Sequence, residues 1–308
     1  MVDLPTRTDT CLMHRGAELR DFLRSRRARL TPSDLGLAWP SGGRRVRGLR
    51  REEVALAAGV SADYYTRLEQ GRARNVSDQV LDAVARALRL DDLERRHLFA
   101  LTRPTEGARR TAPEQPPKAR AALRAMLDSL DPTPAIIHGP RLEVLGINRM
   151  GKVLLDDFEA MPLRERNMAR WTFLNPQARQ VYREWDVVAP QMVAILRLAA
   201  GRHAEDPALA DLVAELTARS DQFARWWADH PVFQHTHGTK LFHHELVGPM
   251  TINYQSLALS ADPGQSLIIY TADTGSPSEE KLRLLSSWAS GPGRGPERSG
   301  KLLALLDD

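Results

Sequence analysis

The stretch RREEVALAAGVSADYYTRLEQGRARNVSDQVLDAVARAL, residues 50–88, decides the fold of the first part of the chain. Apolar residues recur in it at helical spacing, and Gly59 interrupts the first run just before Ser61. Serine is a common helix N-cap, and Gly71 and Ser77 repeat this pair of signals further on. The stretch therefore predicts three short helices, which cover residues 50–58, 62–70 and 77–90.

We expect the first two of these helices to cross steeply through a tight turn. Val54 and Ala58 on the first helix would meet Tyr65 and Leu68 on the second, so that the helices share apolar contacts. Ala55 is small, which allows the two helices to approach closely. Five residues of the second helix then face outward: Ala62, Asp63, Tyr64, Thr66 and Arg67.

Two further helices flank this stretch. Residues 17–30 place their leucines on one helical face, and residues 91–101 predict a fifth helix. Residues 31–49 are rich in glycine, proline and arginine and predict a long loop. Residues 1–13 carry little pattern, so we expect a frayed tail there.

A proline-rich segment divides the chain. Residues 103–118 hold four prolines and no apolar periodicity, which indicates a linker. A length of 308 residues is enough for two domains of ordinary size. We therefore expect an all-helical domain at 14–102, the linker at 103–118, a second domain at 119–290 and a flexible tail at 291–308.

The second domain combines strands with helices. Two strand-like runs flank Gly139-Pro140 and predict a hairpin, and three more runs follow a long helical region at 160–230. The five runs cover 135–138, 142–147, 240–247, 250–259 and 266–272, and a closing helix is expected at 277–288. The predicted fold class is therefore α+β, in which the all-α domain precedes a five-stranded antiparallel sheet with a helical insert and with helices on one face. Such a sheet is a common cradle for small ligands, as in PAS-type domains.

The two parts differ in charge. Residues 1–103 hold 20 arginines and lysines against 14 acidic residues, whereas residues 104–308 hold 23 against 25. A basic domain joined to a mildly acidic one is typical of a module that binds a polyanion and is linked to a second function.

Several classes of protein are disfavoured. The single cysteine, Cys11, allows no intrachain disulfide, which fits a reducing cytoplasm. No apolar run approaches the roughly 20 residues that span a bilayer, and the N-terminus lacks the apolar core of a signal peptide. The sequence also lacks the nucleotide-binding, serine-hydrolase and zinc-protease motifs, so we expect a cytoplasmic protein that is not an enzyme and makes no membrane contact.

Residues 16–102 resemble the XRE/Cro-type helix-turn-helix family. The resemblance rests on Gly59-Val60-Ser61, on the run Arg67-Leu68-Glu69-Gln70-Gly71 and on Ser77. Tyr65 stands where an aliphatic residue is usual, and the loop at 31–49 is longer and richer in arginine than the family pattern. The resemblance implies that the chain binds double-stranded DNA, with the start of the second helix in the major groove.

The resemblance also implies roles for individual residues. Arg67 would read a guanine edge, Thr66 a thymine methyl or a phosphate, and Asp63 a cytosine. The complete set of expected DNA contacts is Arg44, Arg47, Ser61, Ala62, Asp63, Tyr64, Thr66, Arg67, Arg72 and Arg74.

Alternatives remain open for three of these features. Arg67 is also placed to form a surface ion pair with Asp63, four residues before it. Tyr64 is as well suited to helix packing as to DNA contact. The arginines of the loop can equally be solvated without a specific contact.

Residues 120–290 resemble the ligand-binding domain of MmyB-like regulators. The segments that carry this resemblance include TPAIIHGPRLEVLGINRMGKVLL (133–155), RERNMARWTFLNPQAR (164–179) and HGTKLFHHELVG (237–248). It implies a PAS-like domain, which in at least one member binds a medium-chain fatty acid. The chain departs from the pattern at Gly146-Ile147, where an aromatic residue is usual, and at Glu245, where proline is usual.

A ligand pocket needs apolar walls and a few polar groups that orient the ligand. Trp171, Phe173, Trp185 and Trp226 are candidates for the walls, with ordinary core packing as the alternative. Arg166 or Arg170 could bind a ligand carboxylate, with a structural salt bridge as the alternative.

Four histidines suggest a metal site at first sight: His235, His237, His243 and His244. Cysteine is absent nearby, and Glu245 alone supplies a carboxylate. Strand alternation sends adjacent residues to opposite faces, so that at most three of the histidines could converge. We therefore expect neither a metal nor a cofactor.

Taken with the resemblances, the sequence predicts a DNA-binding transcription regulator whose second domain senses a small, fatty-acid-like ligand. A homodimer is expected, because one short helix reads only a few base pairs and two copies match the halves of a palindrome. The alternative is a regulator whose second domain serves only dimerisation or binds a protein partner.

Overall fold

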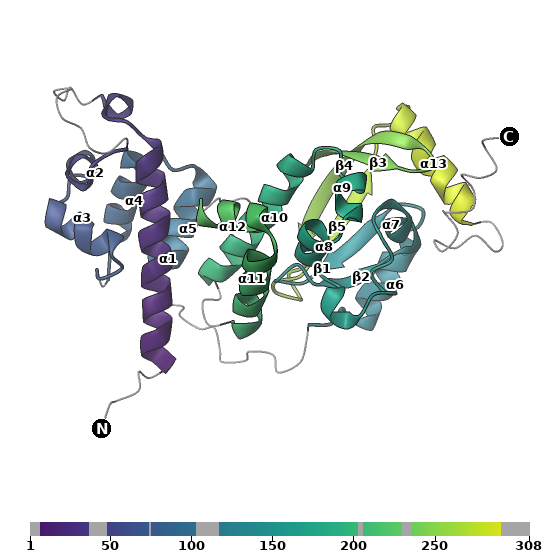
Figure 1. Ribbon diagram of the computed structural model, residues 1–308, viewed down its shortest axis with the longest axis horizontal. Coiled ribbons are helices and arrows are strands. Elements are labelled where there is room, and N and C mark those ends of the chain that lie inside the picture. Colours follow the sequence, from purple (N-terminus) through teal and green to yellow (C-terminus); the bar gives the residue numbers. More distant parts are fainter. Residues whose placement is uncertain are drawn as a thin grey trace. The chain divides into compact units, whose positions relative to one another are not determined.

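The computed structural model describes residues 7–36, 48–73, 75–102, 117–202, 206–229 and 236–290 (Figure 1). The chain divides into two compact units. Within the described ranges, the first unit comprises Met1–Ala112, Arg197–Leu212 and Arg225–Gln234, and the second comprises Pro113–Leu196, Val213–Ala224 and His235–Asp308.

The N-terminal part of the first unit consists of one long helix and several short ones. They are α1 (Arg7–Arg29), a 3-10 turn (Pro32–Leu35), α2 (Arg51–Ala58), α3 (Ala62–Glu69), α4 (Asp78–Ala87) and α5 (Asp92–Thr102). Each of the five α-helices overlaps a helix that the sequence predicted. However, α1 begins ten residues earlier than expected, so the prediction of a frayed tail is wrong from Arg7 onward.

Polar caps fix where these helices begin and end. The Ser61 Oγ accepts a hydrogen bond from the backbone N–H of Tyr64 at 3.1 Å, and the Ser77 Oγ accepts one from Val80 at 3.4 Å. Gly59 ends α2 at a φ of 67°, a left-handed conformation that glycine adopts without strain. The serine and glycine signals in the sequence therefore correspond to real helix boundaries.

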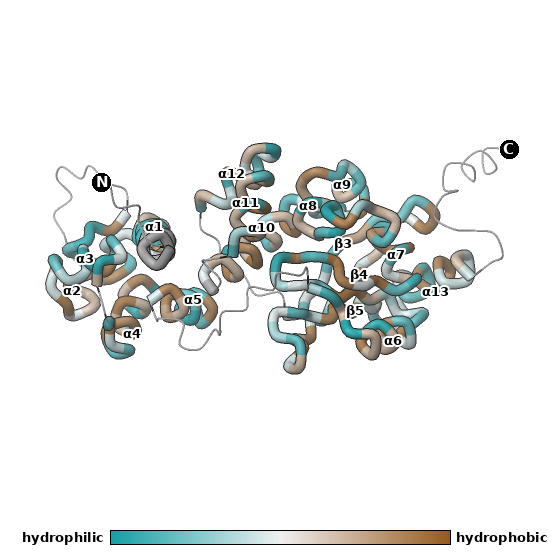
Figure 2. The backbone as a smooth tube through the Cα atoms, turned by 90° about the horizontal axis from the view of Figure 1, so that it is seen from below, coloured by the Kyte–Doolittle hydropathy of each residue, from teal (hydrophilic) through white to brown (hydrophobic). Residues whose placement is uncertain are grey.

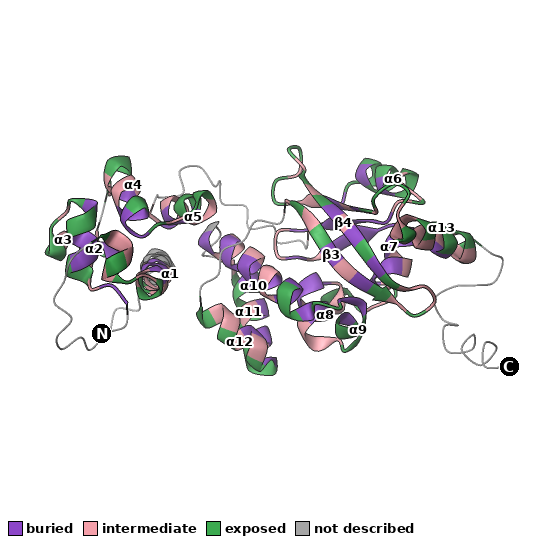
Figure 3. Cartoon of the chain, turned by 90° about the horizontal axis from the view of Figure 1, so that it is seen from above, coloured by how far each residue is buried: buried purple, intermediate pink, exposed green. Residues whose placement is uncertain are grey.

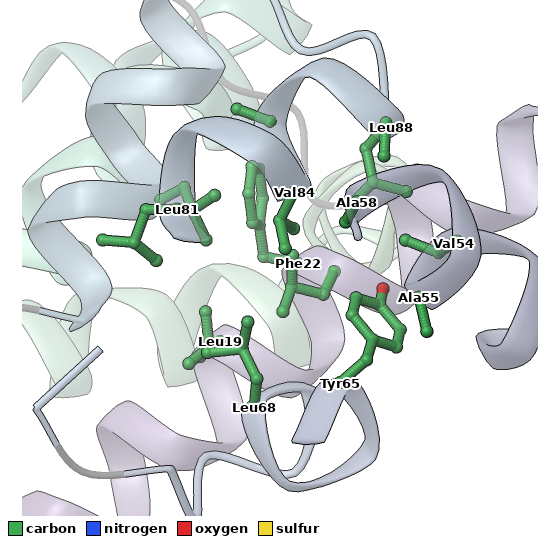
Figure 4. Close-up of a cluster of buried hydrophobic side chains, with 14 of the residues drawn as sticks. Leu19, Phe22, Val54, Ala55, Ala58, Tyr65, Leu68, Leu81, Val84 and Leu88 are labelled. Atoms are coloured by element: carbon green, nitrogen blue, oxygen red, sulfur yellow. The ribbon is translucent and has the colours of Figure 1, made fainter. Parts of the chain in front are cut away.

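One hydrophobic core joins these helices (Figure 4). Tyr65 and Leu68 point into it from α3 and are fully buried, as are Val54 on α2 and Phe22 on α1. Ala55 belongs to the same core. The predicted apolar contact between the helices α2 and α3 is confirmed.

The first unit also includes the end of α10 (Trp185–Arg202), the start of α11 (Pro207–Arg219) and the second half of α12 (Asp221–Ala228). Arg197 on α10 donates to a Glu18 carboxylate oxygen at 2.8 Å. Its guanidinium carbon lies 3.6 Å from the centre of the Trp227 ring. Arg197 is only 1% exposed, whereas its partner Glu18 is half-buried.

The second unit is built on an antiparallel five-stranded sheet in the order β2-β1-β5-β4-β3. The strands are β1 (Ala135–His138), β2 (Val144–Ile147), β3 (His237–His244), β4 (Gly248–Ala258) and β5 (Ser266–Thr271). The predicted hairpin and the predicted three-strand meander are both present, joined through the pairing of β1 with β5.

Helices fill the chain between β2 and β3, as expected for a helical insert. They are α7 (Arg149–Leu154), the 3-10 turn Leu163–Glu165, α8 (Met168–Leu174), α9 (Gln177–Val181), α10, α11 (Pro207–Arg219) and α12. Outside the insert, α6 (Ala121–Ser129) precedes the sheet and α13 (Pro277–Ala289) follows it.

Helices cover both faces of the sheet, which corrects the expectation of one covered face. On one face Ile137 and Leu267 pack with Leu127 of α6. On the other, the ring of Tyr182 at the end of α9 packs on the ring of Phe242 of β3, with centroids 5.2 Å apart. The reason lies in β1, whose four residues are all buried, so that both of its faces need cover. By contrast, Figure 3 shows buried and exposed residues alternating along β3 and β4.

Gly146, one of the departures from the family pattern, lies against α6. A Cβ at this position would stand 3.1 Å from the Leu127 Cδ2 atom. Gly146 pairs with Ile137, which packs on the α6 side of the sheet. An aromatic side chain at this position would therefore meet α6.

Candidate functional site

Helix α3 has one buried face and one polar face. Tyr65 and Leu68 are buried in the core, whereas Ser61, Asp63 and Arg67 are exposed. The tube of α3 is coloured mainly as hydrophilic in Figure 2. Of the other expected contacts on this helix, Ala62 is exposed, and Tyr64 and Thr66 are half-buried. A helix anchored by two core residues can present such a surface to a partner.

Arg67 forms the ion pair that the sequence left open as an alternative. Its Nη2 lies 3.1 Å from the Asp63 Oδ2, with side-chain exposures of 57% and 78%. Ion pairs as exposed as this contribute about 1 kcal/mol or less. A guanine edge or a phosphate could therefore replace Asp63 as the partner of Arg67 at little energetic expense.

The end of α3 is held by a fully buried carboxylate, that of Glu69. Arg27 of α1 donates to Glu69 through Nε at 3.0 Å, and Arg51 of α2 donates through its Nε at 2.8 Å. Arg27 also donates to the Leu49 carbonyl at 2.6 Å. This network ties α1, α2 and α3 together, and sequence reasoning missed it although Glu69 is part of the family motif.

Arg72 follows α3 directly and is exposed, as a phosphate contact requires. Arg44, Arg47 and Arg74 lie outside the described residues, so their expected contacts with DNA stay predictions.

The aromatic residues expected as pocket walls take part in packing. Trp171 is buried, donates from Nε1 to Asp156 at 2.8 Å and meets the Tyr182 ring edge-on, with centroids 5.7 Å apart. Phe173 and Trp185 form a second edge-on pair at 5.7 Å. Trp171 belongs to a chain of rings that continues through Tyr182 to the sheet.

Trp226 belongs to a different part of the molecule. It lies within the segment Arg225–Gln234, which is grouped with the first unit, whereas Trp171 and Trp185 belong to the second. Its expected place in a pocket wall stays a prediction.

Both arginines expected to bind a ligand carboxylate have partners within the protein. Arg166 donates to the backbone carbonyls of Met161 and Glu159 at 3.0 and 2.7 Å. Arg170 donates to the Glu215 carboxylate at 2.6 Å, and this hydrogen bond is the main cause that lowers the pKa of Glu215 to about 2. Arg170 thus forms the structural salt bridge that was its alternative, whereas Arg166 is bonded to the backbone, and a ligand contact by either arginine stays a prediction.

Two buried basic residues escaped the sequence analysis. Lys240 on β3 is 4% exposed, and His138 on β1 is 7% exposed. Burial lowers the pKa of Lys240 to about 7. Burial, assisted by the charge of Lys240, lowers the pKa of His138 to about 3. A signal was present, because Lys240 and Phe242 are two residues apart and so share one face of β3.

No metal centre is found among the described residues, where no group of three or more His, Cys, Asp or Glu side chains comes together. His243 is exposed and His244 half-buried, in line with the alternation expected for a strand. His235 lies outside the described part of the chain.

Two known protein families match the chain. The family model of the MmyB-like transcription regulator ligand binding domain matches residues 119–285, more than half of the chain. The chain belongs to this family. In this MmyB-like regulator a second family model, a helix-turn-helix domain, matches residues 18–98. No curated protein matches the chain.

The two families together describe a DNA-binding transcription regulator with a ligand-binding domain. In the MmyB-like regulator, α2 and α3 are the two helices of the helix-turn-helix motif. None of its described helices is both long and apolar enough to cross a membrane.

Proposed function

We propose that this chain is a cytoplasmic, homodimeric transcription regulator that grips double-stranded DNA with α3 and senses a small apolar, fatty-acid-like ligand in its second domain. The observation that carries the proposal is the exposed polar face of α3, fixed from behind by Tyr65 and Leu68. Helices of this kind enter the major groove with their N-terminal residues.

The proposed DNA surface retains all ten expected residues. Ser61, Ala62, Asp63, Tyr64, Thr66 and Arg67 contribute from α3 and its cap, Arg72 and Arg74 from the turn after it, and Arg44 and Arg47 from the preceding loop. Arg67 reads a base edge in exchange for its ion pair with Asp63, and the basic residues outside α3 bind phosphates.

A dimer follows from the size of this surface. One α3 reaches only a few base pairs, whereas two copies reach half-sites one helical turn apart. Ligand binding that changes the separation of the two α3 helices changes operator affinity by linkage. We place the DNA-binding domain at 14–102, the linker at 103–118, the sensing domain at 119–290 and the tail at 291–308.

A PAS-like arrangement is part of the proposal for the second domain. The hairpin β1–β2, the helical insert and the meander β3–β5 support it, because Tyr182 of the insert packs on Phe242 of the sheet as the wall of a ligand site would. Trp171, Phe173 and Trp185 belong to this wall.

The DNA-binding part is tested by Arg67→Ala. An operator is first selected from random duplexes with the wild-type chain, and affinity is then measured by fluorescence anisotropy. We expect Arg67→Ala to weaken operator binding at least tenfold, while weak, salt-sensitive binding to unrelated DNA remains. Arg95→Ala serves as control, because Arg95 is an exposed arginine paired with Asp82 on the other side of the helix-turn-helix motif. Unchanged operator affinity in Arg67→Ala would exclude the proposed role.

The sensing part is tested by native mass spectrometry of the gently purified chain. A stoichiometric small molecule retained by the protein and released on denaturation would support a sensor. A dimer that carries no ligand and is captured by a second protein would instead support a protein-interaction role for the second domain.

A further inference from the structure

A hollow of about 500 Å³ lies at the outer edge of the sheet, where α9 ends beside β3 (Figure 1). Volumes between about 300 and 1,000 Å³ are usual for sites that bind small molecules. The lining comes from α9 and the turn after it, from the end of β3 with the turn that follows, and from the start of β4. The lining residues are Arg179, Gln180, Arg183, His243, Glu245 and Pro249.

Backbone pairing brings Arg183 and His243 to one face of this edge. Tyr182 forms an antiparallel bridge with Phe242, and the backbone N–H of Arg183 donates to a carbonyl of β3 at 3.0 Å. Residues next to a bridged pair point to the opposite face, so Arg183 and His243 both lie on the face opposite to that of the Tyr182 ring. Pro249 pairs with His243 in the register of β3 with β4 and shares its face.

Arg179 and Arg183 differ from the other arginines of the second unit. Neither guanidinium group has a hydrogen bond or an ion pair with any residue that the structure describes. The other described arginines of this unit all have a carboxylate or carbonyl partner: Arg120, Arg124, Arg141, Arg149, Arg164, Arg166, Arg170, Arg219 and Arg283. The two unpaired guanidinium groups line the same hollow. Because they repel each other, an anion held between them would stabilise both.

Arg179 is held in place without the use of its hydrogen-bond donors. Its guanidinium carbon lies 3.6 Å from the centre of the Trp185 ring. Trp185 is only 5% exposed, and its Nε1 donates to the Thr172 carbonyl at 2.9 Å. A guanidinium group that stacks on an aromatic ring keeps its N–H groups available at the edge of the stack. Arg179 is therefore pre-organised, so that less conformational entropy is lost when an anion binds.

The remaining side chains define which anion fits. His243 and Gln180 offer further hydrogen-bond donors, and neither side chain has a partner within the described part of the chain. Glu245 is the one carboxylate of the lining, and its charge opposes an anion. A phosphate monoester carries about two negative charges at pH 7 and three acceptor oxygens, whereas a carboxylate has one charge and two oxygens. The phosphate can therefore pair with both guanidinium groups at once.

We propose that this hollow is a further ligand site of the chain, which binds the phosphate group of a small phosphate monoester. Arg179 and Arg183 supply the positive charge and paired hydrogen bonds, and His243 supplies a third donor. The inference does not rest on the sensing function proposed above, since it stands on the unpaired arginines and on the hollow that they share.

The first test compares two anions on the same ring. Phenyl phosphate and benzoate are titrated into the full chain at pH 7.5, and binding is followed by isothermal calorimetry. We expect saturable binding of one phenyl phosphate per chain and at least tenfold weaker binding of benzoate. A chain that binds neither anion, or binds both equally well, overturns the proposal.

The second test removes one of the two charges. Arg183→Gln should weaken phenyl phosphate binding at least tenfold. Arg283→Gln is the matched control, because it removes the same charge at an exposed position of the same unit, where Arg283 pairs with Glu279. It should leave the affinity unchanged. Both side chains are exposed, so both variants are expected to fold, and a circular dichroism melt checks this. An equal loss in the two variants would show that binding follows the net charge of the chain, which overturns the proposal.

Glu245→Gln provides a test of opposite sign. The substitution removes the carboxylate of the lining, so phenyl phosphate should bind severalfold more tightly. Damage to the fold would not tighten binding, and this variant therefore separates a role of the hollow from a loss of structure. An unchanged affinity would place the phosphate away from Glu245 and overturn the proposed site.

Two further measurements distinguish the sources of the phosphate and the kinds of ligand. If the hollow binds the DNA backbone instead, Arg183→Gln should reduce the salt dependence of binding to unrelated duplexes. We expect no reduction, and a clear one overturns the small-molecule site. Decanoate, a medium-chain fatty acid that probes the proposed sensing function, should bind the wild type and Arg183→Gln equally. Loss of decanoate binding together with phenyl phosphate binding would show one shared site and overturn a separate phosphate site.

Discussion

Glu69 and Lys240 are both buried charged residues, and the protein stabilises them in different ways. Glu69 receives hydrogen bonds from the guanidinium groups of Arg27 and Arg51 and so connects three helices. Lys240 lies among aromatic rings and responds to burial with a lowered pKa. Glu69 holds three helices together, whereas Lys240 can change its protonation state near neutral pH.

Glu69→Gln should destabilise the first unit by about 3 kcal/mol, because it leaves Arg27 and Arg51 around a neutral amide. Asp63→Asn provides the matched control. It removes a carboxylate from an exposed ion pair and should change stability by about 0.5 kcal/mol or less. Urea unfolding followed by circular dichroism measures both. Equal effects for the two variants would contradict the structural role of Glu69.

Lys240 should also make stability depend on pH. Its pKa is about 7 in the folded chain, against an ordinary value of 10.5 in the unfolded chain. Between these values the unfolded chain binds one more proton, so the free energy of unfolding rises with pH, by up to about 1.4 kcal/mol per unit. Below pH 7 both states are protonated and this contribution to the slope disappears.

The comparison of wild type with Lys240→Met isolates this effect. We expect the difference in unfolding free energy between the two proteins to change steadily from pH 7.5 to pH 9.5, measured by urea titration with tryptophan fluorescence. A difference that is constant over this range would show that Lys240 remains protonated in the folded chain.

At the scale of elements, α1 and α3 meet at two glycines. A Cβ on Gly71 would stand 2.3 Å from the Gly16 Cα, and Gly71 also has a φ of 67°. Gly71 therefore needs the absence of a side chain, whereas a Cβ on Gly16 would make only ordinary contacts, the nearest at 3.6 Å from the Gly71 Cα. This contact sets the distance between α1 and the end of α3.

Gly71→Ala should therefore be much more destabilising than Gly36→Ala. Gly36 has nearly the same φ, 66°, but nothing lies within 4 Å of its Cβ position. Its substitution carries only the backbone strain, about 1–2 kcal/mol. We expect several kcal/mol for Gly71→Ala, because a backbone must move as well. Similar melting temperatures for the two variants would argue against the close contact.

The elements of this protein were predictable to different degrees. The helix-turn-helix motif could be predicted from the sequence, because Gly59, Ser61 and Ser77 act on the adjacent backbone and their signals are local. The packing of helices on both faces of the sheet was harder to predict, since the continuous apolar run of β1 fits a simple hairpin equally well.

Side-chain partners that are distant in sequence could not be predicted. Arg170 donates to Glu215, which is 45 residues away in the sequence, and Arg27 donates to Glu69, which is 42 residues away. No spacing rule links such positions, so the sequence left Arg170 equally suited to a ligand or to a salt bridge. The burial of Lys240 depends on Tyr182 and Tyr254, which are likewise distant from it in the sequence.

At the scale of the whole molecule, the chain joins a DNA-reading motif to a family of ligand-binding domains. A regulator of this design needs ligand binding and DNA binding to influence each other, and by linkage the influence is reciprocal. The ion pair of the buried Arg197 with Glu18 shows that the end of α10, a helix of the insert, contacts α1. Both residues belong to the first unit, whereas α10 begins in the second, so the chain itself passes from one unit to the other within this helix.

Glu18→Gln should weaken that ion pair. The substitution leaves the buried guanidinium of Arg197 without its carboxylate, so we expect a loss of stability of a few kcal/mol in the first unit. Any effect of decanoate on operator affinity should shrink in this variant. Glu52→Gln, at an exposed position on α2, serves as the control. If Glu18→Gln behaves as the wild type in both assays, the ion pair contributes neither to stability nor to the effect of the ligand on DNA binding.

The central claim is that one chain reads DNA and responds to a small ligand. It is tested most directly by the affinity of the full chain for its selected operator, measured by fluorescence anisotropy with and without saturating decanoate. We expect sequence-specific binding whose dissociation constant changes at least fivefold with decanoate. Specific binding that stays within twofold while decanoate is bound, or the absence of any sequence preference, would contradict the account.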